Sequence, residues 1–346
     1  GTDQGEGLSV RPGSRLLFAL IAAVGSACAS PPRGPVVSPE ARRLVATADA
    51  EVLRGCLKCL EAAAAGYDRA SGLGAPGAAH KAATAWTLVA ARQRELGISD
   101  DAALTRASSL GGPSFDSTLF VAARLPLRSE GVSKERTTPG SRELLEAMES
   151  RGASPELDAL NAKAAEGDLA ARYVLLSAQC SWGRSESVAM PEGLESGGSL
   201  LAFRWATCPP RPDADAMSAE LDSLLAAEPR FHEVHFFRGR AALVMRRTLT
   251  AEREFFQAAD ALPQMAAAWA MLGATRLALE EYVEAAEDMG RVLAIEPAQR
   301  EALLIQTRAF VSLGRYEEAA AAARRLVDMG QWYVSDANYW LAFAET

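Results

Sequence analysis

The chain has 346 residues, of which 49 % are hydrophobic and 23 % are charged, as is ordinary for a folded protein. The net charge of −8 argues against a nucleic-acid-binding protein, because such proteins usually present a basic face. Alanine-rich runs favour helices, and no run of alternating β-branched residues predicts a strand. We therefore expect an all-α protein.

A short apolar run near the N-terminus predicts an export signal. Residues 16–25 are apolar and follow Arg11 and Arg15. A run of ten residues cannot span a bilayer, which needs about 20, but it matches the apolar region of a signal peptide. Val10 is a candidate start, since some bacterial genes begin at a valine codon, and that start would place both arginines in the positively charged leader.

Residues 24–28 resemble a bacterial lipobox, in which cleavage leaves a lipidated cysteine, here Cys28, as the first residue. They depart from the usual pattern at Gly25, where leucine is common. The alternative is cleavage at residues 27–29, an A-x-A-like site that would release the protein. The sequence therefore predicts a signal at residues 1–28 and a flexible tether at residues 29–39.

A block of helices is expected at residues 40–110. Within it, residues 51–70 and 78–96 are predicted as two helices, separated by a Gly- and Pro-rich breaker at residues 71–77. A third, shorter helix is predicted after residues 99–101, which supply Ser and Asp as N-terminal caps.

The next part of the chain is less regular. Residues 111–140 are rich in Gly, Pro, Ser and Thr and predict a linker or an irregular loop. Residues 141–212 predict a further helical region with possible degenerate repeats. Pro155 marks the start of one helix there, because proline suits the first helical position.

The strongest pattern is a repeat in the last third of the chain. Prolines recur with a spacing of 34 residues, and alanines keep the same spacing. The motif Trp-Ala-Met-Leu-Gly at residues 269–273 matches the W-x-x-L-G element of tetratricopeptide repeats. These positions are Pro229, Pro263 and Pro297 for the prolines, and Ala251, Ala285 and Ala319 for the alanines.

These residues resemble the tetratricopeptide family, and the resemblance implies a right-handed α-solenoid of antiparallel helix pairs. The expected units cover residues 231–264, 265–298 and 299–332, within a repeat region of residues 213–346. Gln331 stands where the last proline would be, and residues 338–346 resemble the first helix of a truncated fourth unit.

In tetratricopeptide proteins the first helix of each unit lines the concave surface, so the resemblance also implies which residues bind a partner. The groove would be apolar with two arginines, which suits an extended or helical segment that bears an acidic group. It lacks the Lys and Asn with which the family's chaperone-tail binders hold a carboxylate. The lining residues by register are Glu233, Phe236, Arg240, Leu243, Ala270, Ala274, Leu277, Leu304, Arg308 and Val311, with Ala267 and Glu301 beside them.

Cys56 and Cys59 form a C-x-x-C pattern, which can be a redox pair, a metal site or a haem attachment. Haem attachment needs a histidine next, where the chain has Leu60, and a zinc site needs two more ligands at matching spacing. A thioredoxin-like role needs a βαβ context. A structural disulfide at a helix start or two packed thiols remain.

The cysteine count fits an exported protein. Lipidation of Cys28 would leave four cysteines, an even number that can pair in an oxidising compartment. The pairs Cys56–Cys59 and Cys180–Cys208 are one of 3 ways to join them.

No residues form a recognisable catalytic or cofactor site. His232 and His235 could share a helix face, but they do not form an H-E-x-x-H motif and lack a nearby third ligand, so packing is the better interpretation. No phosphate-binding loop, nucleophile elbow or kinase motif is present in the sequence. We expect no enzyme activity, metal or cofactor.

The sequence thus predicts a non-catalytic scaffold of the bacterial cell envelope that binds a protein or peptide and no nucleic acid. It would be an outer-membrane lipoprotein facing the periplasm if Cys28 is lipidated, and secreted or periplasmic otherwise. One alternative is the accessory or scaffold arm of an envelope enzyme whose catalytic part is unseen. Another is a purely structural spacer.

Overall fold

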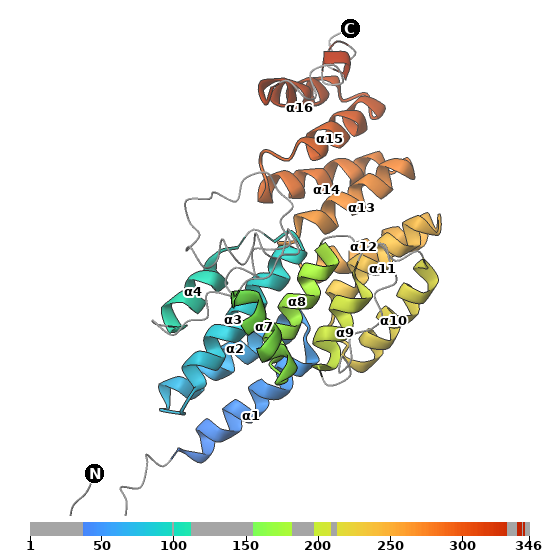
Figure 1. The fold of residues 1–346 in the computed structure, drawn as a ribbon. Helices are drawn as coiled ribbons and strands as arrows, with labels where there is room; N and C mark the ends of the chain where they lie inside the picture. Colours follow the sequence, from blue (N-terminus) through green and yellow to red (C-terminus); the bar gives the residue numbers. More distant parts are fainter. Residues whose placement is uncertain are drawn as a thin grey trace, which may run out of the picture. The chain divides into compact units, whose positions relative to one another are not determined.

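The computed structural model describes residues 37–98, 100–111, 155–181, 197–208, 213–330, 338–340 and 342, all in one compact unit that begins at Val37. Every regular element in these residues is a helix (Figure 1), as expected. The predictions for the signal segment, Cys28 and most of the tether lie outside the described residues, as do those for residues 112–154. No described helix is both long and apolar enough to cross a bilayer.

The N-terminal block contains four helices, α1 (Pro39–Arg54), α2 (Leu57–Gly72), α3 (Ala78–Glu95) and α4 (Ala102–Gly111). Ser38 caps α1, and Asp100 accepts a hydrogen bond of 2.8 Å from the Ala102 amide at the start of α4. The helix predicted for residues 51–70 is in fact broken. Gly55 adopts a left-handed φ of 68°, which ends α1, and Cys56 caps a new helix.

Two helix pairs follow, α7 (Pro155–Ala165) with α8 (Leu169–Ser181) and α9 (Gly198–Ala206) with α10 (Ala214–Ala227). Proline stands at the first position of α7, as predicted. Helix α10 begins the predicted repeat region of residues 213–346, and α9 precedes it.

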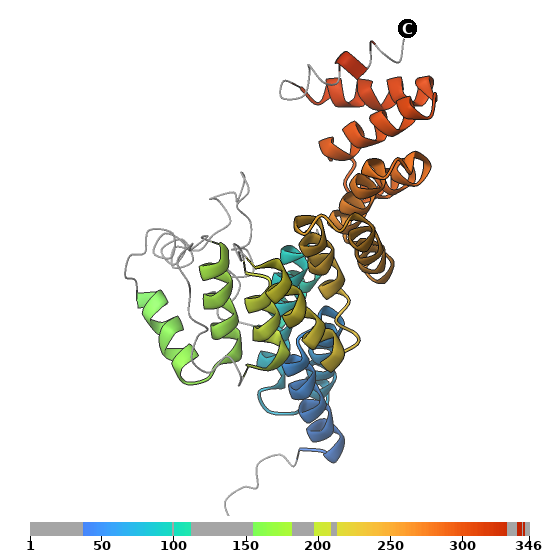
Figure 2. The same ribbon diagram turned by 90° about the vertical axis from the view of Figure 1, so that its right-hand side faces the viewer.

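The repeat region consists of α11 (Glu233–Val244), α12 (Thr248–Ala261), α13 (Ala266–Ala278), α14 (Tyr282–Ile295), α15 (Arg300–Ser312) and α16 (Tyr316–Asp328). The second helices begin at residues 214, 248, 282 and 316, so the spacing of 34 residues extends from α10 to α16. Figures 1 and 2 show these helices as successive layers. The described part of the chain is therefore a tetratricopeptide-like array of sequential antiparallel helix pairs.

The small residues of the repeat lie where the two helices of a pair approach each other. Ala251, Ala285 and Ala319 are all fully buried. A Cβ atom on Gly239 would lie 2.6 Å from the Phe255 ring, which is closer than atoms pack. The absence of a side chain there lets α11 and α12 pack closely.

The turns inside the three repeat pairs share one backbone geometry. Arg246, Glu280 and Gly314 occupy the same repeat position and have φ angles of 57°, 65° and 68°. After each of them an amide donates to a carbonyl five residues earlier, as in a Schellman motif. Only glycine adopts this conformation without steric cost, so two of the three turns carry strain.

Replacing Glu280 by glycine is expected to raise the free energy of unfolding by about 0.5–1 kcal/mol, because it removes the left-handed strain of a Cβ-bearing residue. Urea denaturation followed by circular dichroism measures the change. Replacing Gly314 by alanine is the mirror experiment and should lower the stability by about 1 kcal/mol. Equal stability of Glu280→Gly and the wild type would contradict the strain.

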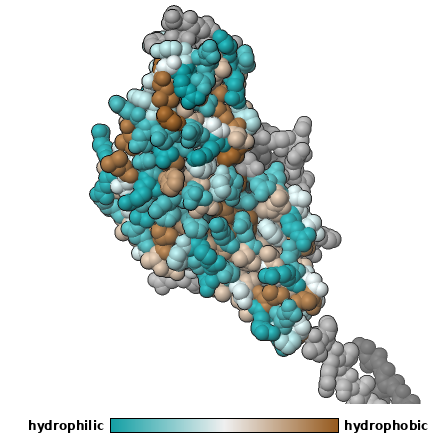
Figure 3. Space-filling model, turned by 180° about the vertical axis from the view of Figure 1, so that it is seen from behind, coloured by the Kyte–Doolittle hydropathy of each residue, from teal (hydrophilic) through white to brown (hydrophobic). Residues whose placement is uncertain are grey.

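One hydrophobic cluster runs from the N-terminal block into the repeats. It includes Leu57 and Leu60 of α2, Phe203 of α9, and Phe231 and Phe255 of the first repeat pair. On the face shown in Figure 3, hydrophobic residues occur in small separated groups among hydrophilic ones. The block and the repeats are thus packed through a shared core.

Candidate functional site

The predicted binding residues of α11 divide between the interior and the surface. Glu233 is 1 % exposed and Phe236 is 8 % exposed, whereas Arg240 is exposed and Leu243 is half-buried. This corrects the assignment of Glu233 and Phe236 to an open groove. Glu233 is buried because the N-terminal block covers the start of α11, and Phe236 is buried because it packs against the rings of Phe237 and Phe255.

Glu233 connects α11 to two helices of the N-terminal block. Its Oε1 accepts hydrogen bonds of 2.7 Å from the Leu57 amide and 2.8 Å from Arg92 Nη1. Leu57 is the first residue of α2, where amides have no partner within the helix and a negative charge is favoured. Burial raises the pKa of Glu233, and the charge of Arg92 and the Leu57 amide oppose that rise. Glu233 therefore caps a helix far away in the sequence.

Arg92 extends this contact into a buried polar network. Its Cζ lies 4.0 Å from the centroid of the Phe203 ring, and its Nε lies 3.2 Å from Glu95 Oε2. Glu95 also accepts a hydrogen bond of 2.7 Å from the Tyr173 hydroxyl and pairs with Arg204 Nε at 3.0 Å. Burial, and then Glu95, raise the pKa of Tyr173, so its hydroxyl stays a donor. Helices α3, α8, α9 and α11 are joined in this way.

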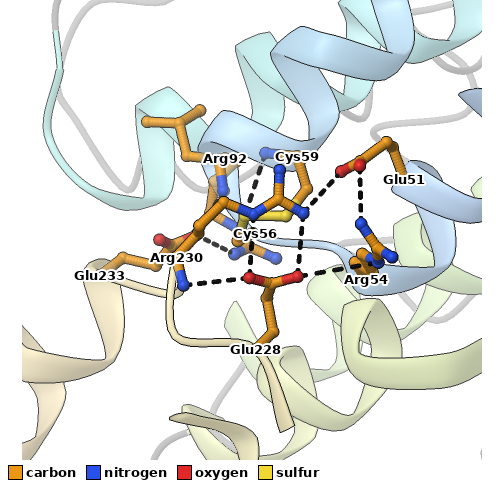
Figure 4. Close-up of a disulfide and its surroundings, with 9 residues drawn as sticks. Glu51, Arg54, Cys56, Cys59, Arg92, Glu228, Arg230 and Glu233 are labelled. Atoms are coloured by element: carbon orange, nitrogen blue, oxygen red, sulfur yellow. Dashed lines mark hydrogen bonds and ion pairs between the residues drawn. A yellow bond between two sulfur atoms is a disulfide. The ribbon is translucent and has the colours of Figure 1, made fainter.

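Cys56 and Cys59 form a disulfide beside this network, which is one of the two alternatives that the sequence leaves open (Figure 4). Cys56 caps α2, and its Sγ accepts a hydrogen bond of 3.0 Å from the Cys59 amide. Both residues are fully buried, so the disulfide is closed to solvent thiols in the folded chain. Its position fits a structural role at the helix start.

Cys208 is disulfide-bonded as well. The side chain of Cys180, its partner in one of the three possible connectivities, lies outside the described residues.

A second ionic cluster closes the edge of the same junction (Figure 4). Arg230 donates from Nε and Nη2 to the two carboxylate oxygens of Glu228, each at 2.9 Å, and from Nη2 to Glu51 Oε2 at 2.9 Å. Glu51 also pairs with Arg54 at 2.8 Å. Because Arg230 lies between α10 and α11 and Glu51 lies on α1, this cluster again ties the block to the repeats.

The hydrogen bonds from Arg230 hold the pKa of Glu228 at about 2, against the opposing effect of burial. Since this pKa is below its unfolded value of 4.5, the pair stabilises the fold above pH 4.5 and this contribution is lost as the pH falls to about 2. The expected loss in the free energy of unfolding is about 1–2 kcal/mol, because Arg230 is partly exposed and solvent screens its pair with Glu228.

Glu228→Gln should therefore be less stable than the wild type at neutral pH and should lose less stability on acidification. Urea denaturation at a series of pH values measures both effects. Glu317→Gln, which changes an exposed carboxylate of α16, is the control and should follow the wild type. Parallel curves for Glu228→Gln and wild type would contradict the assigned linkage.

The remaining predicted binding residues lie on α13 and α15. Ala270, Ala274 and Leu277 of α13 are half-buried. On α15, Leu304 and Val311 are half-buried and Arg308 is exposed. We call these six residues, which share three repeat positions on two successive first helices, the repeat face.

The histidines of α11 take part in packing and pairing. His235 holds the repeat position of Trp269, and its Nδ1 lies 2.8 Å from Glu254 Oε2. Burial, followed by the charge of Lys58, lowers the pKa of His232. In the residues that the structure describes, no group of three His, Cys, Asp or Glu side chains could hold a metal ion.

No motif or periodicity in the sequence indicates the Arg92–Glu233 junction. Arg92 lies in an alanine-rich helix, where a basic residue usually faces solvent. Glu233 has an exposed counterpart, Glu301, two repeats later, so the repeat pattern places it on the surface. Only the packing of the N-terminal block reveals that both side chains are buried.

No protein-family model matches the chain, and a search of curated proteins found no match. Among solved structures, the chain is similar to the crystal structure of yeast Tom70, with a TM-score of 0.37 and 12 % identity over 88 % of this chain and 80 % of that one. It is also similar to the TPR2AB domain of yeast Sti1 in complex with pHSP90, with a TM-score of 0.30 and 14 % identity over 88 % of this chain and 98 % of that one.

Proposed function

We propose that this chain is a non-catalytic platform that binds a protein or peptide partner on the repeat face. The observation that carries the proposal is the combination of half-buried Leu277, Leu304 and Val311 with the exposed guanidinium of Arg308. The packed junction with the N-terminal block holds the first repeat pair in place. A rigid array that presents apolar side chains beside a cation is suited to capturing a segment of another chain.

The chemistry of the repeat face indicates the partner. Ala270 and Ala274 have small side chains, so a segment that binds on α13 could approach that helix closely. Apolar side chains of the partner would cover Leu304 and Val311, and an acidic group would pair with Arg308. The partner is therefore an extended or helical segment that carries apolar side chains and an acidic group.

A displayed library of random peptides tests this proposal with the complete chain as bait. We expect the selected peptides to be enriched in apolar residues and in Asp or Glu. Their affinity should fall at least about tenfold for Leu304→Ser/Arg308→Glu. Arg42→Glu, which reverses an exposed charge on α1, is the matched control and should bind like the wild type. Peptides that bind the double variant equally well would disprove the role of the repeat face.

We further propose that the protein works in an oxidising compartment of the bacterial envelope, anchored through Cys28. The apolar segment at residues 16–25 supports export. The bonded states of Cys56, Cys59 and Cys208 support an oxidising environment, because reducing compartments rarely retain disulfides. Labelling of the expressed protein with a fatty-acid analogue should be lost in Cys28→Ala, and retention of the label there would contradict the anchor.

A further inference from the structure

Two neighbouring turns of the repeat array have the same backbone but opposite charge. We name residues 244–253, between and around α11 and α12, the basic turn, and residues 278–287, between and around α13 and α14, the acidic turn. Arg246 and Glu280 share the left-handed position described above. Each residue of the basic turn thus has a structural counterpart 34 positions later.

The charged side chains of the two turns are exact opposites in sign at three counterpart positions. Arg246, Arg247 and Arg253 are exposed on the basic turn. Their counterparts are Glu280, Glu281 and Glu287, of which the first and last are exposed and Glu281 has a side chain 41 % exposed. Equivalent positions of a repeat usually carry similar residues. Here they carry opposite charges, so one turn is basic and the other is acidic.

Exposed apolar side chains accompany the charges. Val244 is 74 % exposed and Leu249 is 70 % exposed on the basic turn, and Val283 on the acidic turn is 45 % exposed. Leu249 and Val283 are counterparts in the repeat. Covering aliphatic side chains that are this exposed removes apolar surface from water, which lowers the free energy of the protein.

The charges of the two turns are little used within the chain. Arg247 is 3.7 Å from Asp215 with both side chains exposed, Glu281 is 3.8 Å from Arg276, and Arg253 is 3.5 Å from the buried Glu254. Contacts this long, each with at least one exposed side chain, contribute little. Arg246, Glu280 and Glu287 have no ion-pair partner in the part of the chain that the structure describes.

We propose that these turns form the interface of a symmetric dimer with a second copy of this chain. In a two-fold arrangement a patch meets itself, so residue i of one copy contacts residue j of the other and j contacts i. With the two-fold axis between the turns, the basic turn of each copy lies against the acidic turn of the other. The opposite charges then pair twice, and Leu249 covers Val283 twice.

Sedimentation equilibrium of the complete chain tests the dimer. The wild type should associate. Its dissociation constant should rise with salt, because added salt shortens the Debye length below its value of about 8 Å at about 0.15 M and screens the charge pairs. Arg246→Glu/Arg247→Glu and Glu280→Arg/Glu281→Arg should each weaken association at least about tenfold, since like charges then meet.

Mixing the two charge-reversed variants gives the decisive result. One then has acidic residues on both turns and the other has basic residues on both, so the mixture should form a heterodimer with affinity near that of the wild type. Arg42→Glu/Arg43→Glu, which reverses two adjacent exposed arginines of α1, is the matched control and should dimerise normally. The substitutions change none of the six residues of the repeat face, so peptide binding should persist in both reversed variants.

Three outcomes would overturn the dimer. They are a wild type that stays monomeric at the highest soluble concentration, association that both reversed variants retain, and a mixture of the variants that stays monomeric.

Discussion

Replacing Glu233 by glutamine is expected to lower the free energy of unfolding by about 3 kcal/mol, because the buried guanidinium of Arg92 then loses one of its charged partners. Glutamine keeps the size of the side chain and can still accept from the Leu57 amide, so lost packing does not account for the change. Arg92→Met should cost a similar amount, since methionine fills the space among the aromatic rings but leaves the carboxylate uncompensated.

The double variant Arg92→Met/Glu233→Gln distinguishes an ionic contact from packing. If the charges interact directly, removing both leaves no unpaired charge between them, and the double variant should be more stable than the sum of the single effects predicts by about 1–3 kcal/mol. Urea denaturation at neutral pH measures all three variants. Additive effects would show that the two residues stabilise the fold independently, contrary to their 2.8 Å contact.

The same variants report on the junction in a second way. Because the negative charge of Glu233 strengthens its hydrogen bond to the Leu57 amide, Glu233→Gln should weaken that bond and increase hydrogen exchange of the Leu57 amide more than that of amides in α14. A uniform rise throughout the chain would mean that the junction has no local effect.

The sequence predicts the repeat region well because its signals are local and periodic. Ala251, Ala285 and Ala319 recur at one spacing, and each is buried at a helix contact, as expected. The period of a repeat array is set by contacts between neighbouring units, so one register fixes many positions at once. The same regularity extends to α10, which begins 34 residues before α12 and is followed by Pro229, the first of the three prolines.

The junction could not be predicted, because it depends on contacts between distant segments. Leu57 and Glu233 are 176 positions apart, and Arg92 and Glu233 are 141 apart. A repeat pattern places Glu233 on the first helix of a unit but carries no information about what another part of the chain lays over that helix. The predicted residues on α13 and α15 are half-buried or exposed, whereas Glu233 and Phe236 at the start of α11 are buried.

The break between α1 and α2 was missed for a related reason. Apolar residues continue at helical spacing through residues 51–70, so periodicity favours one helix, and a single glycine is compatible with that pattern. What requires the break is the neighbour of Gly55. A Cβ atom there would meet the backbone of Leu200 in α9, within 2.5 Å of its amide nitrogen. Gly55 thus serves both the turn and the close approach of the block to α9.

Replacing Gly55 by alanine should consequently lower the free energy of unfolding by about 3 kcal/mol. About 1 kcal/mol of this comes from a Cβ in the left-handed region, and the remainder comes from forcing two backbone segments apart. Gly74→Ala is a matched control, because Gly74 has a φ of 76° and a Cβ there would meet nothing within 4 Å. It should cost only about 1 kcal/mol.

The difference between the two alanine variants isolates the contact between the N-terminal block and α9. It should be about 2 kcal/mol by urea denaturation and should be accompanied by faster hydrogen exchange at the facing ends of α1 and α9 in Gly55→Ala alone. Equal losses in the two variants would mean that the block does not press on α9. The junction would then rest on its ionic contacts, and the Arg92 and Glu233 variants would carry the whole effect.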